Sequence, residues 1–305
     1  MLRFLLGRLA QAIPTLFGAS IVVFMLVHLT GDPALLMLSP DTPAAQVEEF
    51  RQRLGFDDPL PVQYGRFIGG IFTGDLGQSF RFRAPALDLV LQRLPATLQL
   101  AGLAILFASL IGIPMGVLSA MSQGTWVDTF ARGLFFLGQG IPPFWLGLIL
   151  MVVFSVHLGI LPSSGRGSAA QLVMPVATLT VYLTASLARL TRGGMIQSLK
   201  EDFVRTARAK GLGPRSVLFK HALRNTLIPV VTMIGLQLGH LLGGAVVTET
   251  IFAWPGVGRL VVDAVHARDF PVVQAAMLVI VFLFILVNIV VDLMYGLLDP
   301  RIVYE

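Results

Sequence analysis

Side chains that commonly carry out chemistry are sparse in this sequence of 305 residues, which has no cysteine and five histidines. Without cysteine there is no disulfide, thiolate zinc site or cysteine nucleophile. The histidines show neither the H-E-x-x-H pattern nor another metal-ligand spacing. The three lysines are Lys200, Lys210 and Lys220, and none follows a glycine, which excludes a Walker A phosphate loop. The sequence therefore predicts no catalytic residue, no metal site and no cofactor bound by this chain.

Charge is instead concentrated in one stretch, EDFVRTARAKGLGPRSVLFKHALRN, at residues 201–225. The S-x-x-E spacing of Ser198 and Glu201 fits a capping box and predicts that a helix begins there. Gly211 matches the left-handed residue that ends a helix, and Pro214 fits the first position of a new one. The stretch is therefore expected to form a helix, a tight glycine turn and a second helix that continues into an apolar segment.

The rest of the composition is that of a membrane protein, with 55% hydrophobic and 13% charged residues, against about 25% charged residues in soluble domains. Six windows without Asp, Glu, Lys or Arg exceed the ~18 to 20 residues that a helix needs to cross a bilayer. The predicted fold class is all-α, with six transmembrane helices. The windows are 9–31, 94–127, 133–165, 167–188, 225–248 and 270–291. Prolines that invite kinks in them are Pro14, Pro114, Pro142, Pro143, Pro175 and Pro229.

An even number of spans places both termini on one side of the membrane, and the positive-inside rule selects the cytoplasm. With cytoplasmic termini, 13 of the 22 basic residues and 6 of the 17 acidic residues lie inside. The inside then has a net charge of +7 and the outside −2. We therefore expect residues 201–225 to face the cytoplasm. Because few aromatic residues accompany this short basic patch, nucleic acid is not an expected partner.

A polar segment at residues 32–93 follows the first span, and eight acidic residues nearly balance its six basic ones. AAQVEEFRQRLGF after Pro43 predicts one surface helix, DPLPVQYGRFIGGIF predicts a second, and GDLGQSF predicts a loop. The segment is interpreted as a small subdomain outside the membrane, either facing a protein or packed over the membrane domain.

Polar residues within the spans are candidates for contact with a transported solute, because burying them in lipid is costly. Gln237 and His240 lie deeper in their span than Asn288 and Asp292 do, and the loop with Trp254 and Arg259 is expected near an external gate. The alternative for the loop is an interfacial cap anchored by Trp254. Gly235, Gly239 and Gly243 share one helix face. This face is expected either to pack closely against another helix or to slide along it when the protein changes shape. Intramembrane carboxylates for ion coupling are almost absent, which favours energy input from another subunit.

The order R-T-A-R-A-K-G-L, followed by H-A-L-R-N-x-L-I-P, resembles the EAA loop of binding-protein-dependent ABC importer permeases. Ala207, Gly211 and Leu223 match the general pattern. Arg205, Thr206, His221 and Arg224 depart from it in the manner of the dipeptide, oligopeptide, nickel and glutathione branch. The resemblance extends over nearly the whole chain: RFLLGRLAQAIPTLFGAS, GDLGQSF, TETIFAWPGVGRLVVDAV, DFPVVQA and VNIVVDLMYGLLDPRI.

This resemblance implies a type I ABC importer transmembrane fold in the bacterial inner membrane. The implied domains are an N-terminal transmembrane helix (1–31), a periplasmic or extracellular helical insertion (32–93), a permease core of five transmembrane helices (94–299) with a coupling loop (193–224), and a cytoplasmic tail (300–305).

It also implies a transport subunit rather than an enzyme, paired with a second homologous permease, two ATPase subunits that use ATP and Mg²⁺, and an extracytoplasmic solute-binding protein. Peptides are the implied substrate. Glutathione, nickel complexes or oligosaccharides are alternative substrates for the same type of transporter. A stand-alone channel or ion-coupled carrier is the alternative of another class. The residues implied to contact the ATPase are Arg205, Ala207, Arg208, Lys210, Gly211, Leu212 and Gly213.

Overall fold

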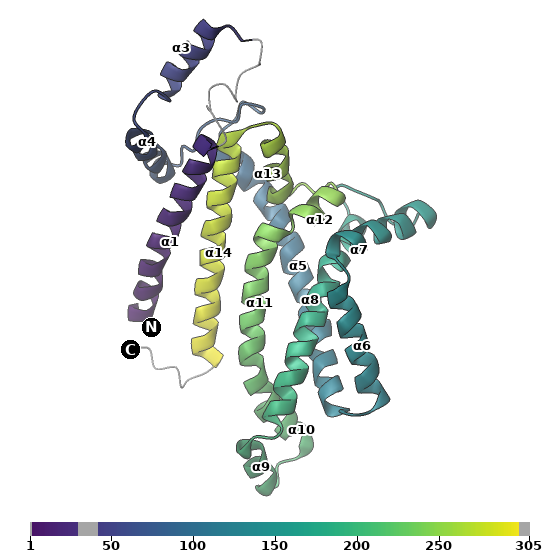
Figure 1. Cartoon of the computed structure of the whole chain (residues 1–305). Coiled ribbons are helices and arrows are strands. Elements are labelled where there is room, and N and C mark those ends of the chain that lie inside the picture. Colours follow the sequence, from purple (N-terminus) through teal and green to yellow (C-terminus); the bar gives the residue numbers. More distant parts are fainter. Residues whose placement is uncertain (1, 30–41, 299–305) are drawn as a thin grey trace. The chain divides into compact units, whose positions relative to one another are not determined.

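A computed structural model of the chain describes residues 2–29 and 42–298 (Figure 1). Within these ranges every regular element is helical, as predicted, and the only strand-like feature is an isolated bridge between Gln78 and Pro85. The predicted tail at 300–305 and the first part of the predicted insertion lie outside the described residues. The elements are α1 (Leu2–Leu29), α3 (Ala44–Leu54), α4 (Leu60–Thr73), α5 (Ala86–Met121), α6 (Trp126–Gly140), α7 (Pro143–Leu150), η1 (Met151–His157), α8 (Ala169–Ser198), α9 (Asp202–Ala209), α10 (Pro214–Ser216), η2 (Val217–Leu223), α11 (Arg224–Gly244), α12 (Val246–Ile251), α13 (Val257–His266) and α14 (Phe270–Leu298).

The predicted spans correspond to helices long and apolar enough to cross a bilayer. Five are continuous, and up to six spans result if the bent pair Trp126–Gly140 and Pro143–His157 forms one. The bend between these two helices is 96°. It falls at Pro142 and Pro143, two of the prolines expected to kink a span, because proline lacks the N–H that would continue the hydrogen-bond ladder. The window at 133–165 is therefore a broken helix rather than a straight one.

The chain divides into two compact units. One contains Met1–Ala96 and Pro255–Ile285, and the other contains Thr97–Trp254 and Leu286–Glu305. Each unit combines segments that are distant along the chain, whereas the domains expected from the sequence follow chain order and remain a prediction.

In the first unit, the start of α5 packs with α13 and the start of α14 around a buried core. The predicted helices of the polar segment are present as α3 and α4, and each ends at a glycine with positive φ, Gly55 at 69° and Gly74 at 77°. The loop with GDLGQSF follows, as expected. The fully or nearly buried core residues are Ala86, Val90, Val257, Leu260, Ala264, Val272, Ala275 and Ala276.

In the second unit, small residues bring α8 close to its neighbours. A Cβ atom on Gly116 of α5 would lie 2.5 Å from the carbonyl oxygen of Ala188, and one on Gly138 of α6 would lie 2.9 Å from the Cβ of Ala185. Such approaches are possible only without a side chain, as in small-residue helix packing in membranes. On α11, the expected packing role of Gly235 is supported, because the Val291 side chain lies against it and leaves no room for a Cβ.

Candidate coupling element and its surroundings

The basic stretch forms α9 after a short break in the chain. The predicted capping box is wrong: α8 continues through Ser198, and α9 begins at Asp202 with Glu201 as its N-cap. Ser198 belongs to the last turn of α8, so it cannot start a helix, and its hydroxyl oxygen lies 3.3 Å from the Thr226 hydroxyl oxygen instead. The S-x-x-E pattern covers four residues, whereas α8 continues through Ser198, with Ile196 and Leu199 packed on the buried cluster around Met195.

The turn that follows α9 has the geometry of a Schellman motif. Gly211 has φ of +77° and its N–H donates to the Arg208 carbonyl at 2.9 Å, while Leu212 N–H donates to the Ala207 carbonyl at 3.2 Å. These two bonds satisfy carbonyls that the helix end leaves unpaired. Pro214 then occupies the first turn of α10, with Gly213 as N-cap. The predicted helix, glycine turn and second helix are therefore confirmed.

One face of α9 is packed and the other is exposed. Val204 and Ala207 are buried against Val217. The expected contact residue Ala207 is only 4% exposed, so its small side chain sets how closely α9 packs on η2. The outward face carries Arg205 and Arg208, both exposed.

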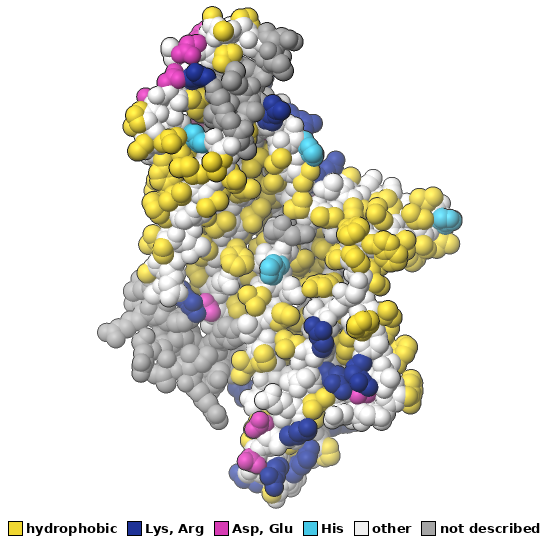
Figure 2. Space-filling view, in the orientation of Figure 1, with side chains coloured by type: hydrophobic (Ala, Val, Ile, Leu, Met, Phe, Trp, Pro, Cys, Tyr) yellow, Lys and Arg dark blue, Asp and Glu magenta, His cyan; other side chains and the backbone are white. Residues whose placement is uncertain are grey.

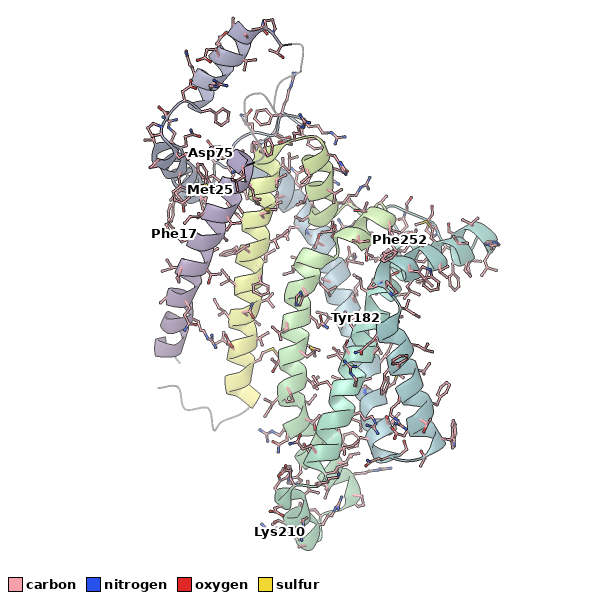
Figure 3. All side chains as sticks on the ribbon, in the orientation of Figure 1. Phe17, Met25, Asp75, Tyr182, Lys210 and Phe252 are labelled. Carbon is pink, nitrogen blue, oxygen red and sulfur yellow. The ribbon has the colours of Figure 1, made fainter. Side chains whose placement is uncertain are left out.

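Positive charge gathers over α9 and the adjoining end of the second unit (Figure 2). Lys210 projects at the outer end of this element (Figure 3). Arg205 forms an ion pair with Asp202 at 3.2 Å, but both side chains are more than three-quarters exposed, at 77% and 92%. Such a pair contributes about 0–1 kcal/mol at most. The basic surface therefore remains available to an acidic or polar partner.

A buried apolar cluster holds the base of this element. Met195 of α8 is fully buried, and it packs with Leu218 and Ala222 of η2 and with Val117 and Ala120 of α5. The segment between α10 and α11 is a π-helix, a wide-turn form that often occurs at functional sites. The turn after α9 is therefore supported by the packed helices α5, α8 and η2.

Next to this base lies a buried ion pair that the sequence did not predict. Arg192 of α8 donates from Nε to Asp128 Oδ1 at 2.7 Å and from Nη2 to Oδ2 at 2.9 Å. Ser119 of α5 donates to the same carboxylate at 2.7 Å, and Gly124 N–H donates at 3.2 Å. The Asp128 side chain is 2% exposed. One carboxylate thus joins α5, the turn after it, α6 and α8.

The residues expected along a solute path belong to two different units. Gln237 is half-buried and His240 is exposed, both on α11. Trp254 is buried, with the Arg166 guanidinium 5.7 Å from its ring centroid. Arg259 is on α13 in the other unit, and its Nε lies 3.9 Å from Oδ2 of Asp263. The expectation of a shared path remains a prediction.

A buried carboxylate beside Trp254 was not predicted from the sequence either. Glu249 of α12 has 0% exposure and accepts a hydrogen bond from Thr97 at 2.6 Å. The backbone carbonyl of Glu249 accepts a hydrogen bond from the backbone N–H of Trp254 at 2.8 Å. Glu249 therefore fixes the short helix α12 against α5 and also the loop that follows. Among the residues that the structure describes, no group of three or more His, Cys, Asp or Glu could hold a metal.

The described chain combines several helices long and apolar enough to cross a membrane with a basic turn on a packed base. The family described as "Binding-protein-dependent transport system inner membrane component" matches residues 112–304, and the N-terminal part of the same kind of component matches residues 1–101. The chain belongs to this family. It is a permease subunit of an ABC importer and a multi-pass protein of the bacterial inner membrane.

The chain is similar over its whole length to curated relatives. It is 44% identical over 306 residues to the glutathione transport system permease protein GsiC of Escherichia coli (strain K12), covering 100% of both chains. The identity and coverage are the same for the proteins of that name from Shigella dysenteriae serotype 1 and Salmonella paratyphi A.

Solved structures share the fold. A chain of the inward-facing MetNI methionine ABC transporter matches with a TM-score of 0.58 and 20% identity, over 70% of this chain and 98% of that one. A chain of an amino acid ABC transporter matches with a TM-score of 0.53 and 18% identity, over 70% and 94%. The predicted type I ABC importer transmembrane fold is thus confirmed.

Proposed function

We propose that this permease carries short peptides across the inner membrane, and that glutathione, itself a tripeptide, is the first substrate to test. The observation that carries this proposal is the 44% identity over the full length to glutathione permeases. The departures at Arg205, Thr206, His221 and Arg224 in the coupling stretch point to the same branch. An extracytoplasmic solute-binding protein would deliver the peptide.

The proposed assembly contains a second homologous permease and two ATPases, which bind ATP and Mg²⁺. One ATPase would dock on α9 and its turn, since that surface is exposed, basic and rigidly mounted. The proposed coupling residues are Arg205, Ala207, Arg208, Lys210, Gly211, Leu212 and Gly213. Of these, Ala207 is buried and would act by setting the position of α9.

Transport would then proceed by alternating access. ATP draws the two ATPases together, each displaces the coupling element that it holds, and the permeases rotate as rigid bodies between outward-facing and inward-facing states. Gln237, His240, Trp254 and Arg259 are proposed to line the path or its gate. Both termini are proposed to be cytoplasmic.

The test is uptake in liposomes that contain this chain with its partner permease and ATPases, with the binding protein on the outside. We expect uptake of labelled glutathione that requires ATP and the binding protein. Uptake by this chain alone, without ATPases, would show a channel or ion-coupled carrier and contradict the proposal.

The peptide class is tested separately by competition in the same liposomes. Unlabelled dipeptides and tripeptides should reduce glutathione uptake if the machine is a general peptide importer. Uptake of a nickel complex or an oligosaccharide, without uptake of any peptide, would reject the substrate while leaving the importer mechanism intact.

A further inference from the structure

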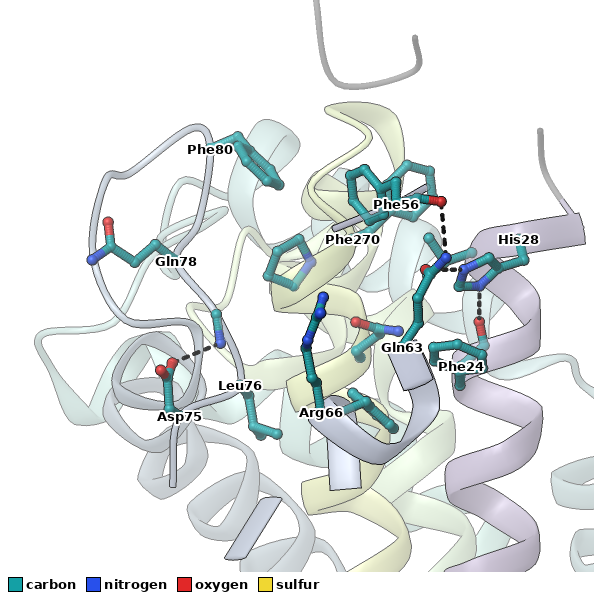
Figure 4. A pocket seen from close by; sticks show the side chains of 15 residues that line it. Phe24, His28, Phe56, Gln63, Arg66, Asp75, Leu76, Gln78, Phe80 and Phe270 are labelled. Carbon is teal, nitrogen blue, oxygen red and sulfur yellow. Dashed lines mark hydrogen bonds between the residues drawn. The ribbon is translucent and has the colours of Figure 1, made fainter. Parts of the chain in front are cut away.

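A pocket of about 740 Å³ lies in the unit that contains α1, α4 and the start of α14. Its walls come from the last turns of α1, from α4, from the loop after α4 and from the first turn of α14 (Figure 4). Ligand sites commonly measure ~300–1,000 Å³ and combine apolar walls with a few polar groups. Neither the coupling element nor the residues proposed for the solute path line this pocket.

The apolar wall is largely aromatic. The Phe24 ring centroid lies 5.8 Å from that of Phe67 and 5.3 Å from that of Tyr64, which packs behind it. Phe80 and Phe270 line the pocket from the loop and from α14. This wall offers a broad apolar surface to a hydrocarbon chain.

Polar side chains line the remaining part of the pocket. Arg66 enters it from α4, and one N–H of its guanidinium donates to Asp58. Gln78 and Gln274 also line the pocket, and their side chains make no hydrogen bond within the part of the chain that the structure describes. Asp75 accepts the Gly77 N–H at 3.1 Å. The pocket thus offers unused donors beside one carboxylate.

Hydrogen bonds hold the α4 side of the pocket in shape. The Gln63 amide nitrogen donates to the carbonyls of Phe56 at 2.9 Å and Asp58 at 2.8 Å. Its amide oxygen lies 3.0 Å from Nε2 of His28 on α1. The Gln63 side chain therefore connects α4 by hydrogen bonds to the turn before it and to α1.

The loop side is fixed by Asp269, a carboxylate that is 1% exposed. It accepts hydrogen bonds from the Ser79 hydroxyl and from the N–H groups of Phe80 at 3.3 Å and Arg81 at 3.4 Å. The loop wall is consequently formed before any ligand enters, which lowers the ordering cost of binding.

The pocket lies beside the ends of two candidate membrane spans. Phe24 and His28 belong to the end of the candidate span Ala10–Leu29, and Phe270 begins the span Phe270–Met294. The adjacent helix α4 leaves large apolar side chains exposed, notably Phe72 at 87%. Exposed apolar side chains of this size beside two span ends favour contact with the membrane interface over contact with water.

We propose that this pocket binds the head-group end of a membrane phospholipid. The Arg66 guanidinium would bind the phosphate, since arginine is well suited to phosphate oxygens. Asp75 would accept a hydrogen bond from the amine of a zwitterionic head group, and the upper acyl chain would lie against Phe24 and Phe67. A small soluble anion would use only the arginine, whereas an amphiphile matches both walls and the position beside two candidate span ends.

The test uses the full-length chain in nanodiscs that contain a phosphatidylethanolamine with a photoreactive acyl chain. We expect light to label the peptide that contains the last turns of α1 and the peptide that contains α4. Arg66→Gln should reduce this labelling about tenfold, the effect of losing roughly one strong contact, and Arg66→Lys should retain part of it. Gln274→Trp, which fills the pocket, should also reduce it.

The matched control is Arg81→Gln. Arg81 is exposed on the neighbouring loop, lies over the Phe82 ring at 5.4 Å and does not line the pocket. Its replacement should leave the labelling unchanged. Thermal stability of each variant in detergent shows that the fold is retained.

Three results would overturn the proposal. One is labelling of α4 that is the same in Arg66→Gln and in the original chain. Another is labelling spread evenly along α1 and α14, which indicates only lipid surrounding the helices. The third is loss of labelling on adding inorganic phosphate alone, which shows a site for a free anion.

Discussion

At the scale of single residues, Gly211 is the position where backbone conformation and proposed function meet. Its φ of +77° lies in the left-handed region, and a Cβ there would contact no atom within 4 Å. A side chain would therefore fit in space but would strain the backbone, by about 1–2 kcal/mol for a residue forced into that region. The constraint at Gly211 is conformational rather than steric.

Gly211→Val should therefore shift the turn after α9 and reduce ATP-driven uptake by about tenfold or more, since about 1.4 kcal/mol corresponds to a factor of ten. The chain should still insert in the membrane. Uptake and the amount of inserted protein are measured together, with Gly133→Val on α6 as the control, because Gly133 is an exposed helical glycine with open space around it and lies outside the coupling loop. Normal uptake by Gly211→Val would reject the assignment of this turn to coupling.

At the scale of elements, the Asp128 and Arg192 pair determines how α8 is held against α5 and α6. Arg192 lies six residues before the end of α8, or about 9 Å along the helix axis. The Asp128 side chain is 2% exposed and that of Arg192 is 20% exposed, and removing one partner from a fully buried pair typically costs about 3–5 kcal/mol, which is an upper bound here. The pair is therefore suited to fixing one arrangement of helices next to the coupling element.

Asp128→Asn and Arg192→Gln should each lower the thermal stability of the purified chain and reduce ATP-driven uptake. The exchanged double variant, Asp128→Arg with Arg192→Asp, should recover only part of both losses. The ion pair is restored with its direction reversed, but Arg132, whose Nε lies 3.6 Å from Asp128 Oδ2, would then face a second arginine. Arg189→Gln, an exposed position on the same helix, serves as the control. If the double variant shows the summed losses of its parents, the pair does not act as a unit.

Close packing of α5 on α8 leads to a second prediction for the elements. Gly116→Val would place a side chain where the Ala188 carbonyl oxygen lies, and backbone cannot move aside as a flexible side chain can. We expect a marked loss of thermal stability, of the order of 1–3 kcal/mol as for overpacked cores. Gly102→Val on the same helix meets no atom within 4 Å and should have little effect. Equal effects of the two variants would contradict this packing.

At the scale of the whole molecule, orientation in the membrane remains the main expectation from charge. Because the chain has no cysteine, single cysteines can be introduced without background labelling. Lys200→Cys, beside the coupling element, should react with an impermeant maleimide only from the cytoplasmic side. Gln52→Cys, exposed on α3, should react only from the outside. The reverse pattern would invert the proposed topology.

How far the sequence could predict this molecule depends on the range of each interaction. Continuous apolar windows predicted the spans, and Gly211 with Pro214 predicted the turn, because these signals act within a few residues. The capping box at Ser198 was wrong because a four-residue pattern cannot show that α8 continues through it. The pair of Asp128 and Arg192, 64 residues apart, could not be predicted from one sequence, because only folding brings the two together.

The 96° bend between α6 and α7 has a consequence for hydration. A helix that begins inside a span leaves its first N–H groups without intrahelical acceptors, here those of Phe144 and Trp145 after Pro143. Hydrocarbon cannot satisfy such groups, so protein or water must reach them. We expect water to penetrate at this level, and hydrogen–deuterium exchange should show these two amides exchanging faster than those in the middle of α8. Slow exchange at both would show that the bend is sealed from solvent.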